Sequence, residues 1–191
     1  MNIFRKAKAN TRENVRYQLR DKDGNIKQLF APNWLFVKLL KLGWAKPTSR
    51  SWFLGSFQDS MVISNLVTNA GMAGVAGRIN GSGSPAAFTY IAIGTGVVAA
   101  DPTDTTLGTE SSGNGADRAA ATVSLVTTDV ANDTARLVKT FTFTGSFALT
   151  ESGIFNAAST GTLLARQVFS AINVISGDSL QITWDIDVDT V

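Results

Sequence analysis

Carboxylates are the side chains in this sequence best placed to do chemistry, and three of them follow one another along a single stretch. Asp185, Asp187 and Asp189 alternate with apolar residues, so a β-strand here would set them about 6.5 to 7 Å apart on one face. Carboxylates in such a row bind calcium when a nearby loop supplies further oxygen ligands. The alternative, which we favour, is a strand face that is solvated or meets cations.

Two further groups of acids have the residue types of a functional site. Asp101, Asp104 and Glu110 form a weaker metal candidate, since the threonines and glycines between them also suit an ordinary loop. Glu151 beside Asp178 or another acid would resemble the paired carboxylates of glycosidases, but the sequence does not give their separation. We therefore predict no enzyme activity, no catalytic residue, no metal and no cofactor.

Several kinds of site are excluded by composition. The 191 residues include no cysteine and no histidine, which rules out disulfides, zinc–thiolate sites, cysteine nucleophiles and an imidazole base. The glycines of 71–83 and 94–96 lack the lysine and the strand-to-helix context of a phosphate loop, and they predict turns. No apolar run approaches the ~20 residues of a membrane span, and the N-terminus lacks a signal-peptide core. The sequence predicts a soluble, non-secreted protein without a membrane partner.

Strict alternation of apolar and polar residues is the main fold signal. It is clearest in 179–188, where one strand face carries five large apolar side chains that need a second sheet to cover them: Leu180, Ile182, Trp184, Ile186 and Val188. Runs of the same kind predict further strands at 61–68, 88–94, 120–128, 135–147, 149–156 and 161–169. This pattern predicts an all-β protein, an antiparallel two-sheet sandwich of jelly-roll or immunoglobulin-like type.

Two segments within this body are expected to differ from strands. Residues 69–79 place Met72, Val75, Ala76 and Ile79 at helical spacing, which predicts a short helix packed closely on a sheet. Residues 94–119 are rich in Gly, Asp, Thr, Pro and Ser, and we expect a long exposed loop there.

The N-terminal part has a different charge and a different pattern. Residues 1–50 hold 12 Lys and Arg against 3 acids, whereas residues 51–191 hold 5 against 12. We expect a basic arm over 1–14, a β-hairpin over 16–30 around an Asp-Gly turn, and a short helix over 34–42 closed by glycine. The predicted division is an attachment segment, 1–57, and a sandwich body, 58–191.

The attachment segment carries many large rings for an irregular linker, and this indicates an interface. Basic residues with interleaved rings also suit nucleic acid, but here the rings cluster with Leu and Val, so we favour a protein partner. The predicted interface residues are Arg5, Lys6, Arg16, Tyr17, Trp34, Phe36, Leu39, Trp44, Trp52, Phe53 and Phe57.

Five phrases in the body occur in an order that resembles a known group of proteins. They are Asn65–Gly71, Tyr90–Gly96, Asp101–Glu110, Leu149–Asn156 and Leu163–Arg166. The order is similar to that in small virion structural proteins of tailed bacteriophages, variously labelled head-decoration, tail or fibre proteins. The resemblance covers 61–191, and residues 1–60 depart from the shorter members of the group.

The resemblance implies a β-sandwich that is assembled into the virion in the host cytoplasm as a symmetric oligomer such as a trimer, with no catalytic residues. In the favoured interpretation the chain is a capsid decoration or cement protein whose N-terminal segment clamps the major capsid protein or a neighbouring copy. The alternative is a neck, tail or baseplate component that anchors a fibre. A carbohydrate-binding or depolymerase role is a distant third.

Overall fold

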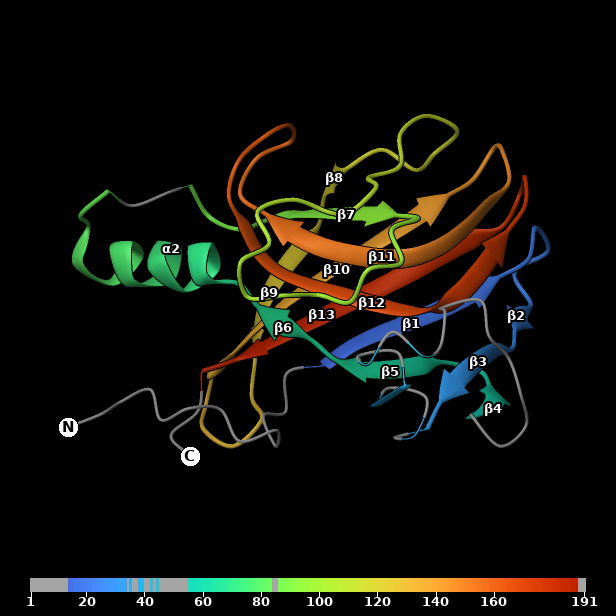
Figure 1. Cartoon of the computed structure of the whole chain (residues 1–191), viewed down its shortest axis with the longest axis horizontal. Helices are drawn as coiled ribbons and strands as arrows, with labels where there is room; N and C mark the ends of the chain where they lie inside the picture. Colours follow the sequence, from blue (N-terminus) through green and yellow to red (C-terminus); the bar gives the residue numbers. More distant parts are fainter. Residues whose placement is uncertain are drawn as a thin grey trace.

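The computed structural model describes residues 14–33, 35, 38–39, 42, 44, 55–83 and 86–188. Over these residues the chain folds into two antiparallel β-sheets packed face to face, with a third, small sheet and a helix at opposite ends of the molecule (Figure 1). The predicted all-β, antiparallel two-sheet sandwich is confirmed. Within the described residues, no helix is long and apolar enough to cross a membrane.

The larger sheet has six strands and contains residues from both ends of the chain. Its order is β2 (Ile26–Lys27), β1 (Asn14–Arg20), β13 (Ser179–Asp187), β10 (Thr134–Thr142) and β9 (Thr122–Val126), and β5 (Met61–Ser64) also pairs with β1. The hairpin predicted over 16–30 is confirmed in part, because β1 and β2 pair antiparallel through Leu19–Lys27 and Arg20–Ile26, whereas Leu29 and Phe30 pair with β4 (Gly55–Gln58) instead. Its turn is held by Asp21, whose Oδ1 accepts hydrogen bonds from the amides of Asp23 and Asn25.

The second sheet has five strands. Its order is β6 (Leu66–Val67), β12 (Leu163–Val174), β11 (Phe147–Phe155), β7 (Tyr90–Gly94) and β8 (Ala119–Ala120). A separate two-stranded sheet joins β3 (Leu29–Pro32) to β4 (Gly55–Gln58). Ser170 on β12 ties this small sheet to the body, because its hydroxyl donates to the Phe30 carbonyl at 2.7 Å.

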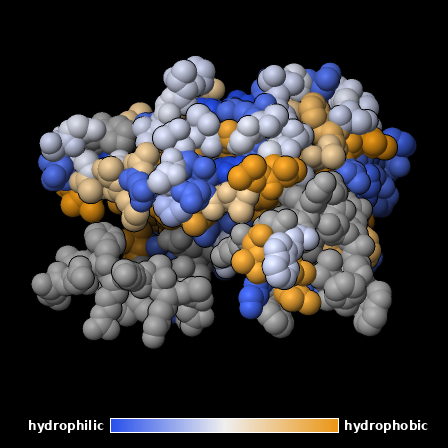
Figure 2. Space-filling model, viewed as in Figure 1, coloured by the Kyte–Doolittle hydropathy of each residue, from blue (hydrophilic) through white to orange (hydrophobic). Residues whose placement is uncertain are grey.

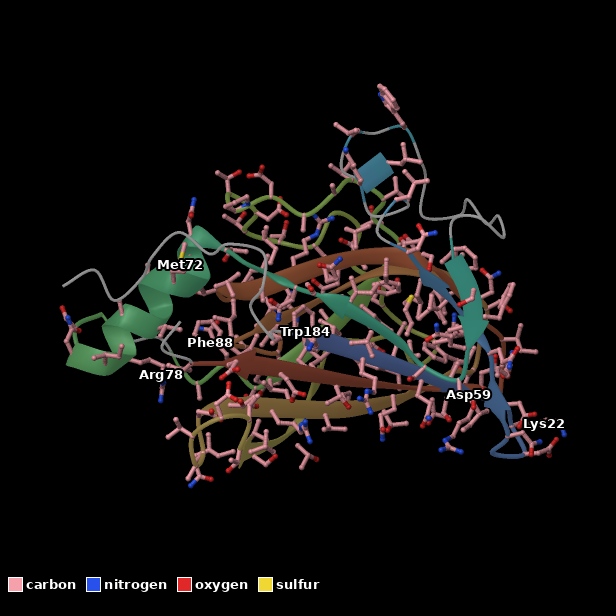
Figure 3. All side chains as sticks on the ribbon, turned by 90° about the horizontal axis from the view of Figure 1, so that it is seen from below. Lys22, Asp59, Met72, Arg78, Phe88 and Trp184 are labelled. Atoms are coloured by element: carbon pink, nitrogen blue, oxygen red, sulfur yellow. The ribbon has the colours of Figure 1, made fainter. Side chains whose placement is uncertain are left out.

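The core lies between the two large sheets and follows the predicted alternation. Leu180, Ile182 and Trp184 of β13 are fully buried, whereas Gln181 on the opposite face is exposed. Figure 3 shows Trp184 among the strands near the middle of the molecule. The apolar face of β13 thus meets the second sheet, as a half-buried strand requires.

Tyr17 belongs to this core, so its assignment to an intermolecular contact is wrong. Its side chain has no exposed surface, its ring centroid lies 4.3 Å from that of Phe169, and its hydroxyl lies 2.7 Å from the hydroxyl of Ser152. Burial raises the pKa of Tyr17, and the hydrogen bond with Ser152 lowers it only in part. The neutral phenol joins the two sheets.

The predicted boundary between residues 57 and 58 is also wrong as a structural division. β1 pairs with β13 along its whole length, from Asn14 opposite Asp185 to Arg20 opposite Ser179. On its other side it pairs with β5. A strand with neighbours on both sides belongs to the body, because its backbone hydrogen bonds are part of the sheet.

The helix α2 (Asn69–Asn80) confirms the predicted element but reverses the predicted face. Its buried residues are Gly71, Gly74 and Gly77, whereas the apolar side chains expected against the sheet face outward: Met72, Val75, Ala76 and Ile79. A Cβ at Gly71 would collide with the backbone of Leu164. Gly71 therefore lets the first turn of the helix approach β12 more closely than a larger residue would allow.

Two other predictions needed correction. The single strand expected over 61–68 is two strands, because the chain passes from one sheet to the other between β5 and β6. The loop over 94–119 is not wholly exposed, since Leu107 and Ala116 are buried. Leu35, Lys38 and Leu39 are helical, but most of the predicted helix 34–42 lies outside the described residues, as do residues 45–54. The predicted arm 1–14 also lies outside them except for Asn14, which begins β1.

Truncation tests the place of β1 in the body. Removing residues 1–13 leaves every described strand intact, so we expect a cooperative unfolding transition close to that of the full chain. Removing residues 1–57 deletes β1, which leaves the backbone edge of β13 unpaired and removes Val15, Tyr17 and Leu19 from the core, so we expect no cooperative transition. Chemical denaturation followed by tryptophan fluorescence measures both, and a stably folded 58–191 fragment would contradict this assignment.

Candidate functional site

The acidic row of β13 faces a cation of the protein itself. Arg136 on β10 donates to both carboxylate oxygens of Asp185, at 2.7 Å from Nε and 2.8 Å from Nη2. Asp187 Oδ1 lies 3.3 Å from the hydroxyl of Thr134, and Asp189 is outside the described residues. No group of three acids in the described parts of the chain could hold a metal ion. This arrangement fits the favoured alternative, a strand face that meets a cation.

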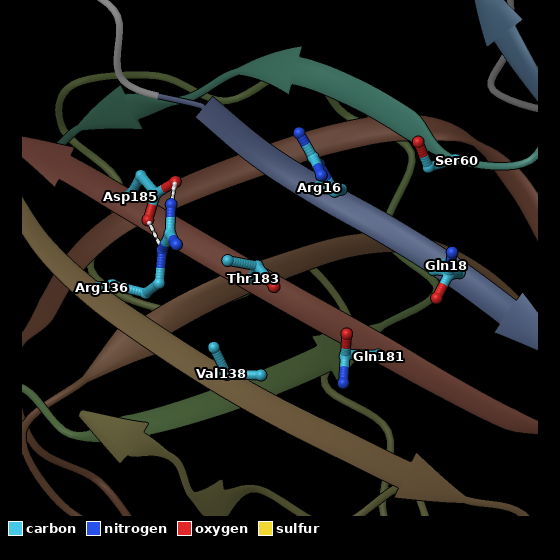
Figure 4. Close-up of a pocket in the computed structure, with 8 residues that line it drawn as sticks. All are labelled: Arg16, Gln18, Ser60, Arg136, Val138, Gln181, Thr183 and Asp185. Carbon is cyan, nitrogen blue, oxygen red and sulfur yellow. Dashed lines mark hydrogen bonds and ion pairs between the residues drawn. The ribbon is translucent and has the colours of Figure 1, made fainter. Parts of the chain in front are cut away.

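This outer face of the larger sheet carries a shallow polar hollow of about 250 Å³ (Figure 4). Its lining is polar apart from Val138 and comes mainly from β1, β10 and β13: Arg16, Gln18, Ser60, Arg136, Val138, Gln181, Thr183 and Asp185. Arg16, which we predicted to lie at an interface, is exposed on this face. The hollow lies on the opposite side of the sheet from the core.

Glu151 is the most completely enclosed acid, with no exposed surface. Its Oε1 accepts hydrogen bonds from the amides of Gly96 at 2.9 Å and Thr109 at 2.7 Å, and its Oε2 accepts one from Gly108 at 2.9 Å. Three backbone donors thus converge on one carboxylate from two separate loop segments. Glu151 is a structural anion that holds the loop following β7.

Arg166 on β12 supplies the opposite charge. Its Nε donates to Glu151 Oε2 at 2.9 Å, its Nη1 to Asp104 Oδ2 at 2.7 Å, and its Nη2 to the Val98 carbonyl at 3.1 Å. Burial lowers the pKa of Arg166, but hydrogen bonds to Asp104 and Glu151 outweigh it and raise the pKa above its ordinary value. We call this cluster of Glu151, Arg166 and Asp104 the ionic lock.

The five phrases of the sequence resemblance meet at this ionic lock. Three of them supply its charged side chains, and the phrase ending at Gly96 adds an amide donor. The phrase containing Thr68 packs beside it, since the Thr68 hydroxyl donates to the Leu163 carbonyl at 2.6 Å and the Asn69 amide donates to the Pro102 carbonyl at 2.8 Å. The phrases therefore describe one packing arrangement of the fold.

The remaining candidate acids also have partners within the chain. Glu110 pairs with Arg118, the Nη2 to Oε2 distance being 2.6 Å. Asp178, which is buried, pairs with Lys27 at 2.7 Å and accepts a hydrogen bond from the Ile175 amide. Glu151 and Asp178 are thus held by different cations, and they do not have the arrangement of a glycosidase pair, in which both carboxyls face one substrate.

The predicted interface residues differ in how exposed they are. Trp44 is 79% exposed and Phe57 is 56% exposed, so both present ring surface outside the core. Phe57 packs edge-on against Phe30, with 5.7 Å between ring centroids, beside a hollow of about 90 Å³. Leu39 is half-buried. The other predicted residues lie outside the description: Arg5, Lys6, Trp34, Phe36, Trp52 and Phe53.

Two apolar surfaces were not predicted. One is the outward face of α2, where Met72 is 52% and Ile79 is 77% exposed, and Figure 2 shows hydrophobic residues over the region that α2 occupies. The other is on β9, where Val123 and Leu125 are 52% and 63% exposed. The three glycines of 71–77 were a signal for the first, because they form the buried face of the helix and leave its apolar side chains on the other face.

Comparison with known proteins adds no assignment. No protein-family model, no curated protein and no solved structure matches this chain.

Replacing Arg166 with methionine tests the ionic lock. Glu151 would stay buried with no cation beside it, so the free energy of unfolding should fall by roughly 3 to 5 kcal/mol. The same substitution at Arg136, whose pair with Asp185 is partly exposed, should cost only about 0 to 1 kcal/mol. Denaturant titration measures the free energy of unfolding of both variants. Equal losses in the two variants would show that the ionic lock stabilises the fold no more than a surface ion pair does.

Proposed function

We propose that this chain is a structural protein of a tailed-bacteriophage virion, and within that class a capsid decoration protein attached through its N-terminal segment. The observation that carries the proposal is the exposure of Trp44 and Phe57, two rings on the segment between β3 and β5. Aromatic side chains are enriched at protein–protein interfaces relative to the rest of the surface. The resemblance of residues 61–191 supports the choice of a virion protein.

The geometry of the Phe57 region supports attachment to another protein. The ring lies beside the hollow of about 90 Å³, which is lined in part by Leu29, Phe30 and Ile172. An apolar side chain of a partner fits such a hollow, and burying apolar surface contributes about 25 cal/mol per Å² removed from water. Repeated copies on a regular shell would add avidity to each weak contact.

The use of the acids supports a non-enzymatic role. Asp104, Glu110, Glu151, Asp178 and Asp185 each form an ion pair with a lysine or arginine of the described chain. A general acid or base must reach a substrate proton. These carboxylates are instead occupied in holding loops and strands together.

Copy number distinguishes the two virion roles. A decoration protein should be present at hundreds of copies per particle, whereas a neck, tail or baseplate component should be present at a few to a few dozen. Quantified gel bands of purified particles, measured against the major capsid protein, give this number. A count in the lower range would replace decoration by the second role.

Ring removal tests attachment directly. Trp44→Ala and Phe57→Ala should each weaken rebinding of the purified protein to particles that lack it by about 30-fold, because a buried ring at an interface contributes about 2 kcal/mol or more. Both side chains are mostly exposed, so unfolding should change little. Val98→Ala, at another exposed apolar position, is the matched control. Undiminished binding by both ring variants would refute attachment through this segment.

A further inference from the structure

β9 is the edge strand of the larger sheet, and its second edge is unpaired in the part of the chain that the structure describes. It pairs with β10 on one side, from Thr122 opposite Val138 to Val126 opposite Thr134. Among the described residues, no strand and no hydrogen bond covers its other side. Its sequence, Thr-Val-Ser-Leu-Val, contains no charge and no proline, which are features that usually keep an edge from pairing.

The inner face of β9 is apolar and continues the core face of the larger sheet, but its side chains are not fully covered by the second sheet. Val123 lies opposite Leu137, which lies opposite the buried Trp184, so all three point to the inner face of the sheet. Leu125 likewise lies in one row with Ala135 and Ile186. Val123 and Leu125 are nevertheless more than half exposed, so core-facing side chains remain in water at this edge.

An extended strand is the occupant that fits this edge, because a row of backbone donors and acceptors is satisfied by another backbone. The strand must also place apolar residues on the inner face and small polar residues on the outer face. β9 itself has this pattern from Thr122 to Leu125. In an antiparallel pair centred on Ser124, Val123 lies opposite the partner's Leu125, and Ser124 lies opposite the partner's Ser124.

Charge does not oppose this pairing. The charged residue beside Ser124 on the outer face is Arg136, and Asp185 neutralises it. An antiparallel pair would also cover the exposed side chain of Leu125 with residues of the second copy. Ala121 is where the chain crosses from β8 in one sheet to β9 in the other, so the end of β9 near Leu125 lies next to the crossover of the second copy.

We propose that a second copy of this chain binds along β9, so that two larger sheets join edge to edge about a two-fold axis through Ser124. This surface is separate from the rings of the proposed attachment site. The small sheet that carries Phe57 lies at the opposite end of the molecule from α2, and the loop between β9 and β10 lies at the α2 end (Figures 1 and 3). Self-association and attachment can therefore be tested independently.

Charge substitution at the paired positions tests both the surface and the register. Val123→Lys alone and Leu125→Glu alone each place a charge against an apolar side chain, so the dissociation constant of the dimer should rise at least about a hundredfold. An equimolar mixture of the two variants places the introduced lysine of one copy against the introduced glutamate of the other and should return to within about tenfold of the wild type. Sedimentation velocity over a concentration series measures all of these.

The control is Ile175→Lys, the same kind of change at an exposed position in the turn before β13, which should leave dimerisation unchanged. Denaturant titration should show that all variants fold, since the replaced side chains are exposed in the single chain. The proposal is refuted by a wild-type chain that stays monomeric up to about 1 mM, by an odd-numbered oligomer, by a dimer insensitive to Val123→Lys, or by a mixture that fails to associate. None of these outcomes bears on particle attachment.

Discussion

The buried pairing of Glu151 with Arg166 is the interaction on which the arrangement of the second sheet depends. A carboxylate with no exposed surface is tolerated only where charge and hydrogen bonds replace the water it has lost. Arg166 and the amides of Gly96, Gly108 and Thr109 provide that replacement. A Cβ at Gly96 would collide with the Glu151 carboxylate. The glycines of this loop are therefore needed for close approach, and the loop is held against the sheet although it contains few apolar residues.

Ion pairing of the same kind holds most of the acids that were candidates in the sequence. Asp178 and Asp185 pair with Lys27 and Arg136, which lie far from them in the sequence. The excess of acids in the body is thereby partly balanced by basic residues of the N-terminal half and of neighbouring strands. The exposed apolar surface that could contact other molecules lies at the rings of Trp44 and Phe57, on α2 and on β9.

The N-terminal segment combines two roles that the sequence suggested were separate. β1 is an interior strand of the larger sheet, whereas β3 and β4 form a small sheet beside it. Phe57 is therefore attached to a rigid base, because its neighbour Phe30 is held by Ser170 of β12 and β4 leads directly toward β5. A contact made by Phe57 would be transmitted to the sandwich without a free tether, which lowers the entropy lost on binding.

The sequence by itself determined the periodic features: the strand class, the inward face of β13, the hairpin at Asp21 and the presence of a helix after Thr68. These depend on alternation, turn residues and capping, which act over a few neighbouring residues. Only the tertiary structure decided that Tyr17 is core, that α2 packs through its glycines, and that Glu151 is bound to Arg166. Each of these depends on which distant segments share a sheet, and the pattern of a single segment is the same whichever partner it finds.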